Sequence, residues 1–415
     1  MEYSETYTYR RPNFAIYGAM ALIPIYVGRV QELSQFLISL HTAKVAIAAA
    51  LLLVAYAPRD GDTSIRAIFS YPQMKYILGI IILGLFSVPF SVWPGQSFSF
   101  MFDFYWKLIV FMLLLVKSVQ FPEDIKKIVW TLFATVAFLV LYSYINPRIV
   151  EGNRVSVTVS YDPNDFALFL IMCFPMLFYL MEEEQGIKKM VLIATLVLML
   201  IAIVKTGSRG GFISLCVALS IMFYRKGFKY VLKSIPIFLS ILLILNITTG
   251  SSSWERFSTI LELEDDYNMD ARGGRVEIWK RGVNLMLKSP VIGWGIGAFA
   301  VAEGSKNEGG MWKTAHNSFI QIGAEIGVAG LALFAMILVK SITTVWRPGK
   351  IDELEWFRKG LEVGFYAFCA GGFFLSWAYS YVLYFFIALA IIYAHLNQAV
   401  SDQSESLHLE SQFNQ

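Results

Sequence analysis

The chain has 415 residues, of which 56% are hydrophobic and 16% charged, and its formal net charge is +3. Soluble domains carry about 25% charged and about 45–50% apolar residues, so this composition excludes an ordinary soluble protein, whose polar surface could not cover the apolar excess. The small net charge gives no reason to expect nucleic acid as a partner.

The apolar residues form long runs, and runs of about 17–25 residues are long enough to span a bilayer. They predict an all-α, polytopic integral membrane protein with about twelve transmembrane helices and one long external loop that contains short helices. The predicted segments are 13–28, 36–57, 75–92, 100–117, 125–145, 165–181, 189–204, 210–224, 230–248, 316–340, 360–377 and 379–397.

Four regions follow from these segments. Residues 1–248 hold helices 1–9, 249–315 form the long loop, 316–397 hold helices 10–12, and 398–415 are a polar tail. Lys and Arg accumulate in cytoplasmic connections of membrane proteins. With the N-terminus inside, the short outer connections hold few of these cations, and we therefore predict that both termini are cytoplasmic and that the long loop is external. The outer cations are Arg29, Arg148, Arg154, Lys205 and Arg209.

The second half of the long loop predicts an amphipathic helix from Arg275 to Lys288, because apolar residues recur in it at helical spacing. Such a helix can lie at the membrane interface or cover a cavity. Ser289-Pro290 ends it, and the glycine-rich run 293–297 predicts a turn.

The run Thr206–Gly211 opens the predicted eighth helix. Ser208 is a suitable N-cap, and glycines let a ligand approach the backbone closely. Free N–H groups at a helix start, together with the Arg209 guanidinium, suit a diphosphate. The alternative is a glycine-rich turn with an arginine that reaches the membrane surface.

His316, in Thr314–Ser318, opens the predicted tenth helix. An imidazole titrates near neutrality and can take a proton from a sugar hydroxyl; the alternative is a capping or interfacial histidine. Gly323 and Gly327 form a GxxxG pair near the same face, which predicts a closely packed neighbouring helix beneath His316. Glu325 projects to the opposite side and is expected to be structural.

Secondary candidates for the site are Lys44, Lys107, Asp165, Arg272 and Asn317. Charges at membrane depth usually face a cavity, although Asp103 and Lys107, four residues apart, could instead form a local ion pair. The predicted sixth, eighth and tenth helices all begin on the outer side. Asp165, Arg209 and His316 are therefore expected at one membrane face.

One pattern resembles a calcium loop: Asp266, Asn268, Asp270 and Glu277 fit positions 1, 3, 5 and 12. Position 6 is Ala271 where the turn needs glycine, and Arg272 and Arg275 add positive charge. We therefore expect neither a metal nor another cofactor.

From Asp162 to Gly330 the chain resembles the O-antigen ligase family, which includes related O-antigen polymerases. The resemblance rests on the order of several short motifs around the long loop, and the first five predicted helices match only in hydropathy. The motifs are Asp-Pro-Asn-Asp-Phe-Ala (162–167), Gly-Ser-Arg-Gly-Gly (207–211), Gly-Arg-Val-Glu-Ile-Trp (274–279), Ser-Pro-Val-Ile-Gly-Trp-Gly (289–295), Ala-His-Asn-Ser-Phe-Ile (315–320) and Glu-Ile-Gly-Val-Ala-Gly (325–330).

The resemblance implies a glycosyltransferase of the bacterial inner membrane whose site faces the periplasm. Its donor would be a glycan on undecaprenyl diphosphate, and its acceptor a saccharide such as lipid A–core or a growing glycan. By matching motif, Arg209 and Arg275 would hold the diphosphate and His316 would act at the acceptor hydroxyl, with inversion at the anomeric carbon.

O-antigen ligase is favoured over an O-antigen or exopolysaccharide polymerase, and ligation to protein hydroxyls is a further variant. A polysaccharide transporter or flippase is the alternative from another class. Transporter sites lie near the midplane between repeats, whereas the polar groups here are predicted near one face and no repeat is visible.

Overall fold

The computed structural model describes residues 13–56, 65–150, 154–227, 273–307 and 309–413. Regular structure in these ranges is almost entirely helical. The only strands in them are β1 (Arg148–Val150) and β2 (Arg154–Ser156), a short antiparallel pair. The predicted all-α class is confirmed for this part of the chain.

Helices of the N-terminal half often begin with proline, whose fixed φ suits the first helical position and whose missing N–H is not needed there. Pro72, Pro94, Pro122 and Pro163 all occupy such starts. The helices are α1 (Ala15–Leu22, continued by a π-helical turn Ile23–Val27), a 3-10 turn (Val30–Leu33), α2 (Gln35–Ser39), α3 (Thr42–Tyr56), α4 (Ile65–Ser70), α5 (Pro72–Ser87), α6 (Pro94–Ser99, continued by the π-helical Phe100–Tyr105), α7 (Trp106–Ser118), α8 (Pro122–Ile145), α9 (Pro163–Glu183), α10 (Gly186–Lys205) and α11 (Arg209–Lys226).

The C-terminal half contains two shorter helices and then the last three long ones. They are α15 (Arg275–Lys288), α16 (Phe299–Lys306), α17 (Ser318–Trp346), a 3-10 turn (Asp352–Leu354), α18 (Glu355–Gly371) and α19 (Tyr381–Phe413). The bounds of α15 confirm the predicted amphipathic helix. The residues predicted as a polar tail continue the backbone of α19 to Phe413.

In the described part of the chain, six helices are long and apolar enough to cross a membrane: Pro94–Ser118, α8, α9, α10, α17 and Tyr381–Ser401. Shorter apolar helices cover Ala15–Val27, Thr42–Ala55 and Pro72–Ser87. Every predicted apolar segment overlaps a helix except 230–248, which lies outside the described residues. A membrane protein is thus supported, while the total of twelve spans stays a prediction.

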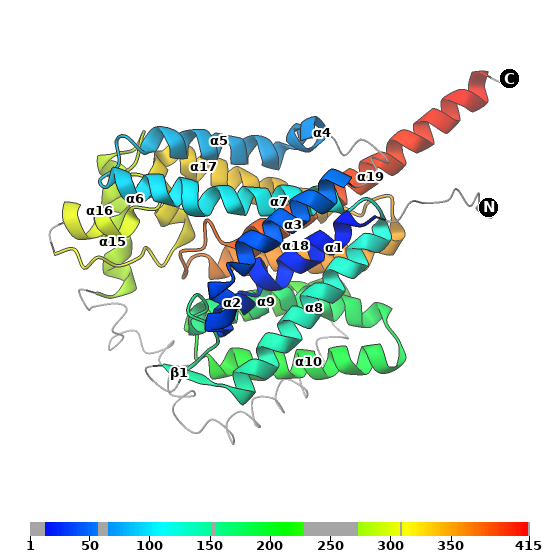
Figure 1. Ribbon diagram of the computed structural model, residues 1–415, viewed down its shortest axis with the longest axis horizontal. Coiled ribbons are helices and arrows are strands. Elements are labelled where there is room, and N and C mark those ends of the chain that lie inside the picture. The colour runs from blue at the N-terminus through cyan, green and yellow to red at the C-terminus, as the bar shows by residue number, and fades with distance from the viewer. Residues whose placement is uncertain (1–12, 57–64, 151–153, 228–272, 308, 414–415) are drawn as a thin grey trace.

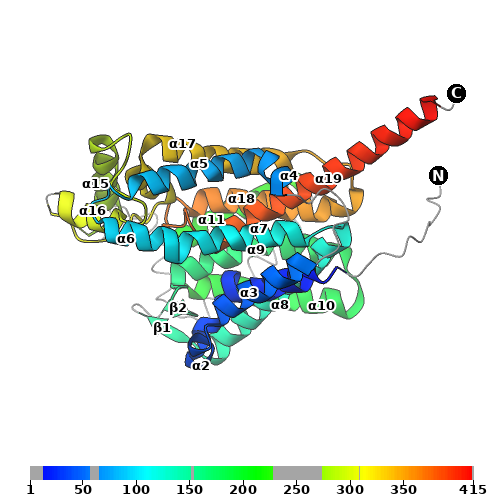
Figure 2. The same cartoon turned by 45° about the horizontal axis from the view of Figure 1, so that its top comes forward.

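Helices α5 and α17 run side by side along the molecule (Figure 1). At one end α15 runs across them, next to α16, and the C-terminal part of α19 projects from the opposite end in both views (Figure 2). Helices α15 and α16 therefore cover one end of the bundle only.

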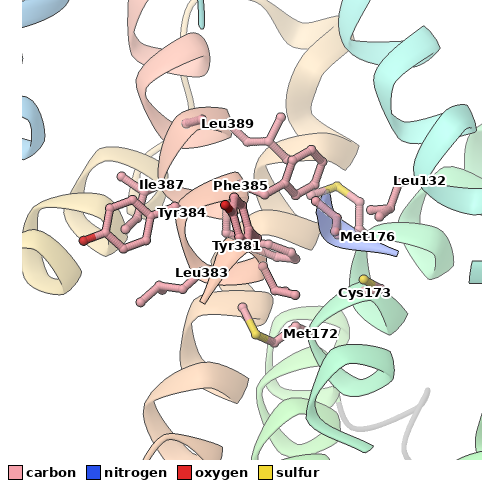
Figure 3. Packing of buried hydrophobic residues seen from close by; sticks show 14 of the residues in the cluster. Leu132, Met172, Cys173, Met176, Tyr381, Leu383, Tyr384, Phe385, Ile387 and Leu389 are labelled. Atoms are coloured by element: carbon pink, nitrogen blue, oxygen red, sulfur yellow. The ribbon is translucent and has the colours of Figure 1, made fainter. Parts of the chain in front are cut away.

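The core lies where α19 packs against α7, α17 and α18, and where α9 packs against α18. Figure 3 shows Tyr381 and Phe385 of α19 near Met172 and Met176 of α9, whereas Tyr384 points away from these methionines. The hydroxyls of Tyr384 and Tyr105 are both buried and lie 2.7 Å apart. This pairing matters because an unpaired hydroxyl in an apolar interior costs free energy.

Helix α17 is broken at Ile326 and Gly327, where Gly327 adopts φ 77°. The loop after α15 satisfies the backbone at the break: Trp294 N–H donates to Ala324 O, Gly295 N–H to Glu325 O, and Val328 N–H to Pro290 O, at 2.9, 2.9 and 2.8 Å. Irregular backbone at membrane depth is tolerated where protein groups satisfy it in this way.

Two predictions about this helix can be compared with the structure. The space beside Gly323 is filled by Met286 of α15, so a closely packed neighbouring helix is found there, whereas the carbonyls of Pro290 and Val291 in a loop fill the space beside Gly327. The carboxylate of Glu325 is buried and accepts from the N–H groups of Gly297 and Phe299 at 2.9 and 3.3 Å. Its predicted structural role is confirmed.

Candidate active site

Two helix starts meet through the side chain of Asn164, in the first turn of α9. Its Oδ1 accepts from Ser208 Oγ at 2.9 Å and from Arg154 at 2.7 Å. Ser208 also accepts from Gly211 N–H at 3.1 Å, which confirms it as the N-cap of α11. Asp162 caps α9 by accepting from the N–H groups of Asn164 and Asp165. The starts of α9 and α11 are therefore fixed relative to each other, with Arg209 as the first residue of α11.

The glycines after Arg209 serve packing. A Cβ on Gly210 would lie 2.7 Å from Phe374, and one on Gly211 would lie 2.9 Å from Ala167 of α9. The expectation that a ligand approaches the backbone of this turn stays a prediction. The missing side chains of the two glycines let α11 lie close to α9 and to the segment around Phe374.

A third helix start carries the histidine. Asn317 caps α17 with its Oδ1, which accepts from Phe319 and Ile320 N–H at 2.9 and 3.0 Å. His316 precedes this cap in a left-handed conformation, φ 46°. Its backbone is held on both sides, since its N–H donates to Ser376 Oγ at 2.9 Å and its carbonyl accepts from Trp279 Nε1 at 3.3 Å. The cap of this helix is thus Asn317, and His316 is free of that role.

A fourth helix start places the second arginine. Arg275 is the first residue of α15, after Gly274 at the N-cap position. Helix α15 packs across the start of α17, where a Cβ on Gly282 would lie 2.4 Å from Ile320. Trp279, one turn after Arg275, makes the hydrogen bond to His316, so Arg275 and His316 belong to the same end of the bundle.

The connection between α18 and α19, residues 372–380, joins all four helix starts. Phe374 contacts Gly210 and its ring lies 6.1 Å from that of Trp279. Ser376 receives the N–H of His316, and Trp377 Nε1 donates to Asp165 Oδ1 at 2.6 Å. This role could not be predicted from the sequence, because the segment is uncharged and lies between two apolar runs.

The electrostatic surroundings favour a neutral imidazole at His316. Burial, and next the positive charge of Arg275, lower its pKa from 6.5 to about 4, against the opposing effect of Asp162. Arg275 and Asp162 are therefore near enough to affect the ring. Its Nε2 lies 3.4 Å from Thr314 Oγ1.

Of the secondary candidates, Asp165 lies in the site, because it accepts the hydrogen bond from Trp377. Lys44 is exposed on α3, and the ammonium of Lys107 lies 6.0 Å from the centre of the Trp106 ring. Asp103 accepts from Ser99, and the ion pairs of the described residues do not include Asp103 with Lys107, so that alternative is wrong. Arg272 lies outside the described residues.

One arginine was missed as a site residue. Arg154 was counted only as an outer cation, but its Nε donates to Thr206 O at 2.8 Å and its guanidinium also reaches Asn164. It therefore supports the turn that carries Arg209. Its position in a short hairpin gave no sign of this contact.

No group of three metal-ligating side chains occurs among the described residues. Asp266, Asn268 and Asp270 of the calcium-like pattern lie outside them, and Glu277 pairs with Lys280 at 2.6 Å. Arg209 and Arg275 are both first residues of helices, where the helix dipole adds positive potential.

The fold and this site together define a helical membrane protein with arginines and a neutral histidine at one end. Residues 194–335, which include Arg209, Arg275 and His316, match the model of a family described as O-antigen ligase. The predicted relationship to the O-antigen ligase and polymerase superfamily is therefore confirmed, and with it, at a coarse level, glycosyl transfer as the activity. No curated protein matches the chain.

Proposed function

We propose that this protein is an inverting glycosyltransferase that moves a glycan from undecaprenyl diphosphate to an acceptor hydroxyl at the periplasmic face of the inner membrane. As its acceptor we propose lipid A–core, which makes it an O-antigen ligase. The observation that carries the proposal is the joining of the Arg209, Arg275 and His316 helix starts through residues 372–380.

In this reaction His316 accepts the proton of the acceptor hydroxyl, whose oxygen forms the new bond to the anomeric carbon. The bond from that carbon to the diphosphate breaks, and its electron pair leaves with the diphosphate. Arg209 and Arg275 stabilise the charge that develops there. A neutral imidazole is the form that can accept the proton, which agrees with the low pKa of His316.

The test measures donor binding and transfer separately on purified protein, at matched expression and thermal stability. His316→Ala is expected to bind the lipid-linked donor normally and to lose about 10²–10⁴ in transfer rate. Arg209→Lys and Arg275→Lys are expected to weaken donor binding, because lysine lacks the two-pronged guanidinium. Arg148→Lys, at an exposed arginine of β1, is the matched control.

Near-normal transfer by His316→Ala contradicts the proposed mechanism. Normal donor binding by Arg209→Ala and Arg275→Ala means that the diphosphate is held elsewhere, and Lys44 and Lys107 are then the next variants to make.

The polymerase alternative differs only in the acceptor, and the glycan of a deletion strain distinguishes the two. Free lipid-linked polymer with unmodified lipid A–core indicates a ligase. Single repeat units on the core indicate a polymerase. A strain that makes neither product and retains lipid-linked units on the cytoplasmic side indicates a transporter.

A further inference from the structure

Trp312 combines two features that rarely occur together. Its side chain is 60% exposed, yet its backbone adopts the left-handed conformation with φ 57°. A non-glycine residue at positive φ is strained and persists only where its surroundings hold it there. Neighbouring groups must therefore hold the backbone of this exposed tryptophan in its conformation.

The backbone of Trp312 is held by Glu303 of α16. This carboxylate is fully buried and accepts from the N–H groups of Met311 and Lys313, at 2.9 and 3.1 Å, on either side of Trp312. Arg281 of α15 fixes the same carboxylate through an ion pair of 2.6 Å. The segment around Trp312 is thus anchored to both α15 and α16.

The indole ring itself lies against the backbone of α16. A Cβ on Gly304 would come within 2.3–2.5 Å of three ring carbons of Trp312. Only glycine leaves room for this contact, which covers part of the ring surface, while the side chain as a whole stays largely exposed.

Two observations indicate what meets the exposed ring surface. First, Trp312 is four residues before His316, and the charge of the intervening Lys313 is one of those that lower the pKa of His316. Second, the neighbours Ser305, Lys306, Lys313 and Thr314 are polar and exposed. By contrast, exposed Trp93 lies near exposed Phe90 and Phe98, as expected of a side chain that meets lipid.

We propose that Trp312 is a stacking platform for a pyranose ring of the acceptor glycan. The carbon-bound hydrogens on one face of a pyranose form an apolar surface that suits an aromatic ring, and the surrounding lysine and hydroxyl groups can bond to its hydroxyls. A pre-positioned ring loses little conformational entropy on binding. This inference rests on the proposed function, because it assumes that His316 serves the acceptor.

The experiment uses the full-length protein in nanodiscs and lipid A–core as the acceptor. It measures KM for the acceptor, KM for the undecaprenyl-diphosphate-linked glycan, and the affinity for core oligosaccharide freed from its lipid. Trp312→Ala is expected to raise the acceptor KM and to weaken oligosaccharide binding, each about tenfold, with the donor KM unchanged. Trp312→Phe is expected to retain most of the affinity.

Two further variants separate stacking from other causes. Gly304→Ala keeps the tryptophan but displaces its ring. It is therefore expected to raise the acceptor KM and to weaken oligosaccharide binding, as Trp312→Ala does. Trp93→Ala, the exposed control, is expected to change neither KM. If the wild-type protein is a polymerase and transfers onto a second lipid-linked glycan, the acceptor KM is measured with that glycan.

An unchanged acceptor KM in Trp312→Ala overturns the proposal that Trp312 is a stacking platform. So does weakened membrane association of Trp312→Ala with oligosaccharide binding intact, which identifies the side chain as a bilayer anchor. Either result leaves the proposed function standing if His316→Ala still abolishes transfer. If His316→Ala retains transfer, the proposed function itself fails.

Discussion

At the scale of single residues, the site holds His316 by its backbone. Ser376 and Trp279 bond its N–H and its carbonyl, whereas Thr314 lies 3.4 Å from ring Nε2, beyond the optimal range for a hydrogen bond. The ring position is thus set without a strong bond to its nitrogens. This suits a base that must exchange a proton with a substrate.

The titration of His316 follows from its surroundings. Its pKa is about 4 in the folded protein and about 6.5 in an unfolded chain, so the unfolded state binds the proton more readily. This ring therefore lowers stability as pH falls from about 6.5 towards 4 and adds no further loss below that. We expect NMR of labelled histidine, assigned with His316→Gln, to show it neutral at pH 5.5.

Arg275→Gln provides the matching variant. Removing this positive charge is expected to raise the pKa of His316, while burial, the larger cause, keeps it below 6.5. An unshifted titration in Arg275→Gln contradicts the proximity of the two groups.

Transfer is expected to need no divalent metal, because the proposed anion-binding groups are arginines and the calcium-like pattern has Ala271 in place of its glycine. An excess of chelator should leave the transfer rate of purified protein unchanged. A large loss that calcium or magnesium restores contradicts this prediction and points back to residues 266–277.

The candidate site residues could be named from the sequence, whereas the residues that support them could not. Arg209, Arg275 and His316 stand out because polar groups are rare beside apolar runs. Ser376 and Trp377 do not, since serine and tryptophan are ordinary in membrane helices. Their roles arise only when α18 and α19 fold back on α9 and α17.

At the scale of elements, the site is an assembly of helix starts. Asp162, Ser208 and Asn317 each cap a helix through a side chain. Each cap satisfies N–H groups that would otherwise be unpaired, and it sets where the helix begins. Arg209, Arg275 and His316 each lie next to an N-cap residue, where small changes in helix length would displace them.

The break in α17 depends on Gly327. Alanine there would need φ 77° and would place its Cβ 2.6 Å from the carbonyl oxygens of Pro290 and Val291. We expect Gly327→Ala to destabilise the protein by about 1–3 kcal/mol or more, seen as a lower unfolding temperature in detergent. Gly95→Ala in α6, where the nearest atom is 3.6 Å away, should change it little. Equal unfolding temperatures for both variants contradict this account of the break.

The helices differ in how far local sequence patterns predict their bounds and breaks. Helix α15 could be predicted to the residue because its apolar spacing and the following Ser289-Pro290 are local signals. The break in α17 could not, since the residues there favour a continuous helix. It forms because the loop 290–295 supplies backbone partners from outside the helix.

At the scale of the whole molecule, the site and the C-terminus lie at opposite ends. Helices α15 and α16 cover one end, and α19 projects from the other (Figures 1 and 2). A lipid-linked donor requires the reactive end to face the compartment where both substrates are present. The proposed function therefore depends on which end is outside.

The distribution of lysine and arginine predicts that the end with the C-terminus is cytoplasmic. Alkaline phosphatase, which is active only outside the cytoplasm, should be active when fused at Ser252 and inactive at Gln398. Green fluorescent protein, which fluoresces only inside, should give the reverse result, and together the two reporters control for expression. Phosphatase activity at Gln398 contradicts the topology, since His316 would then face the cytoplasm, away from a periplasmic acceptor.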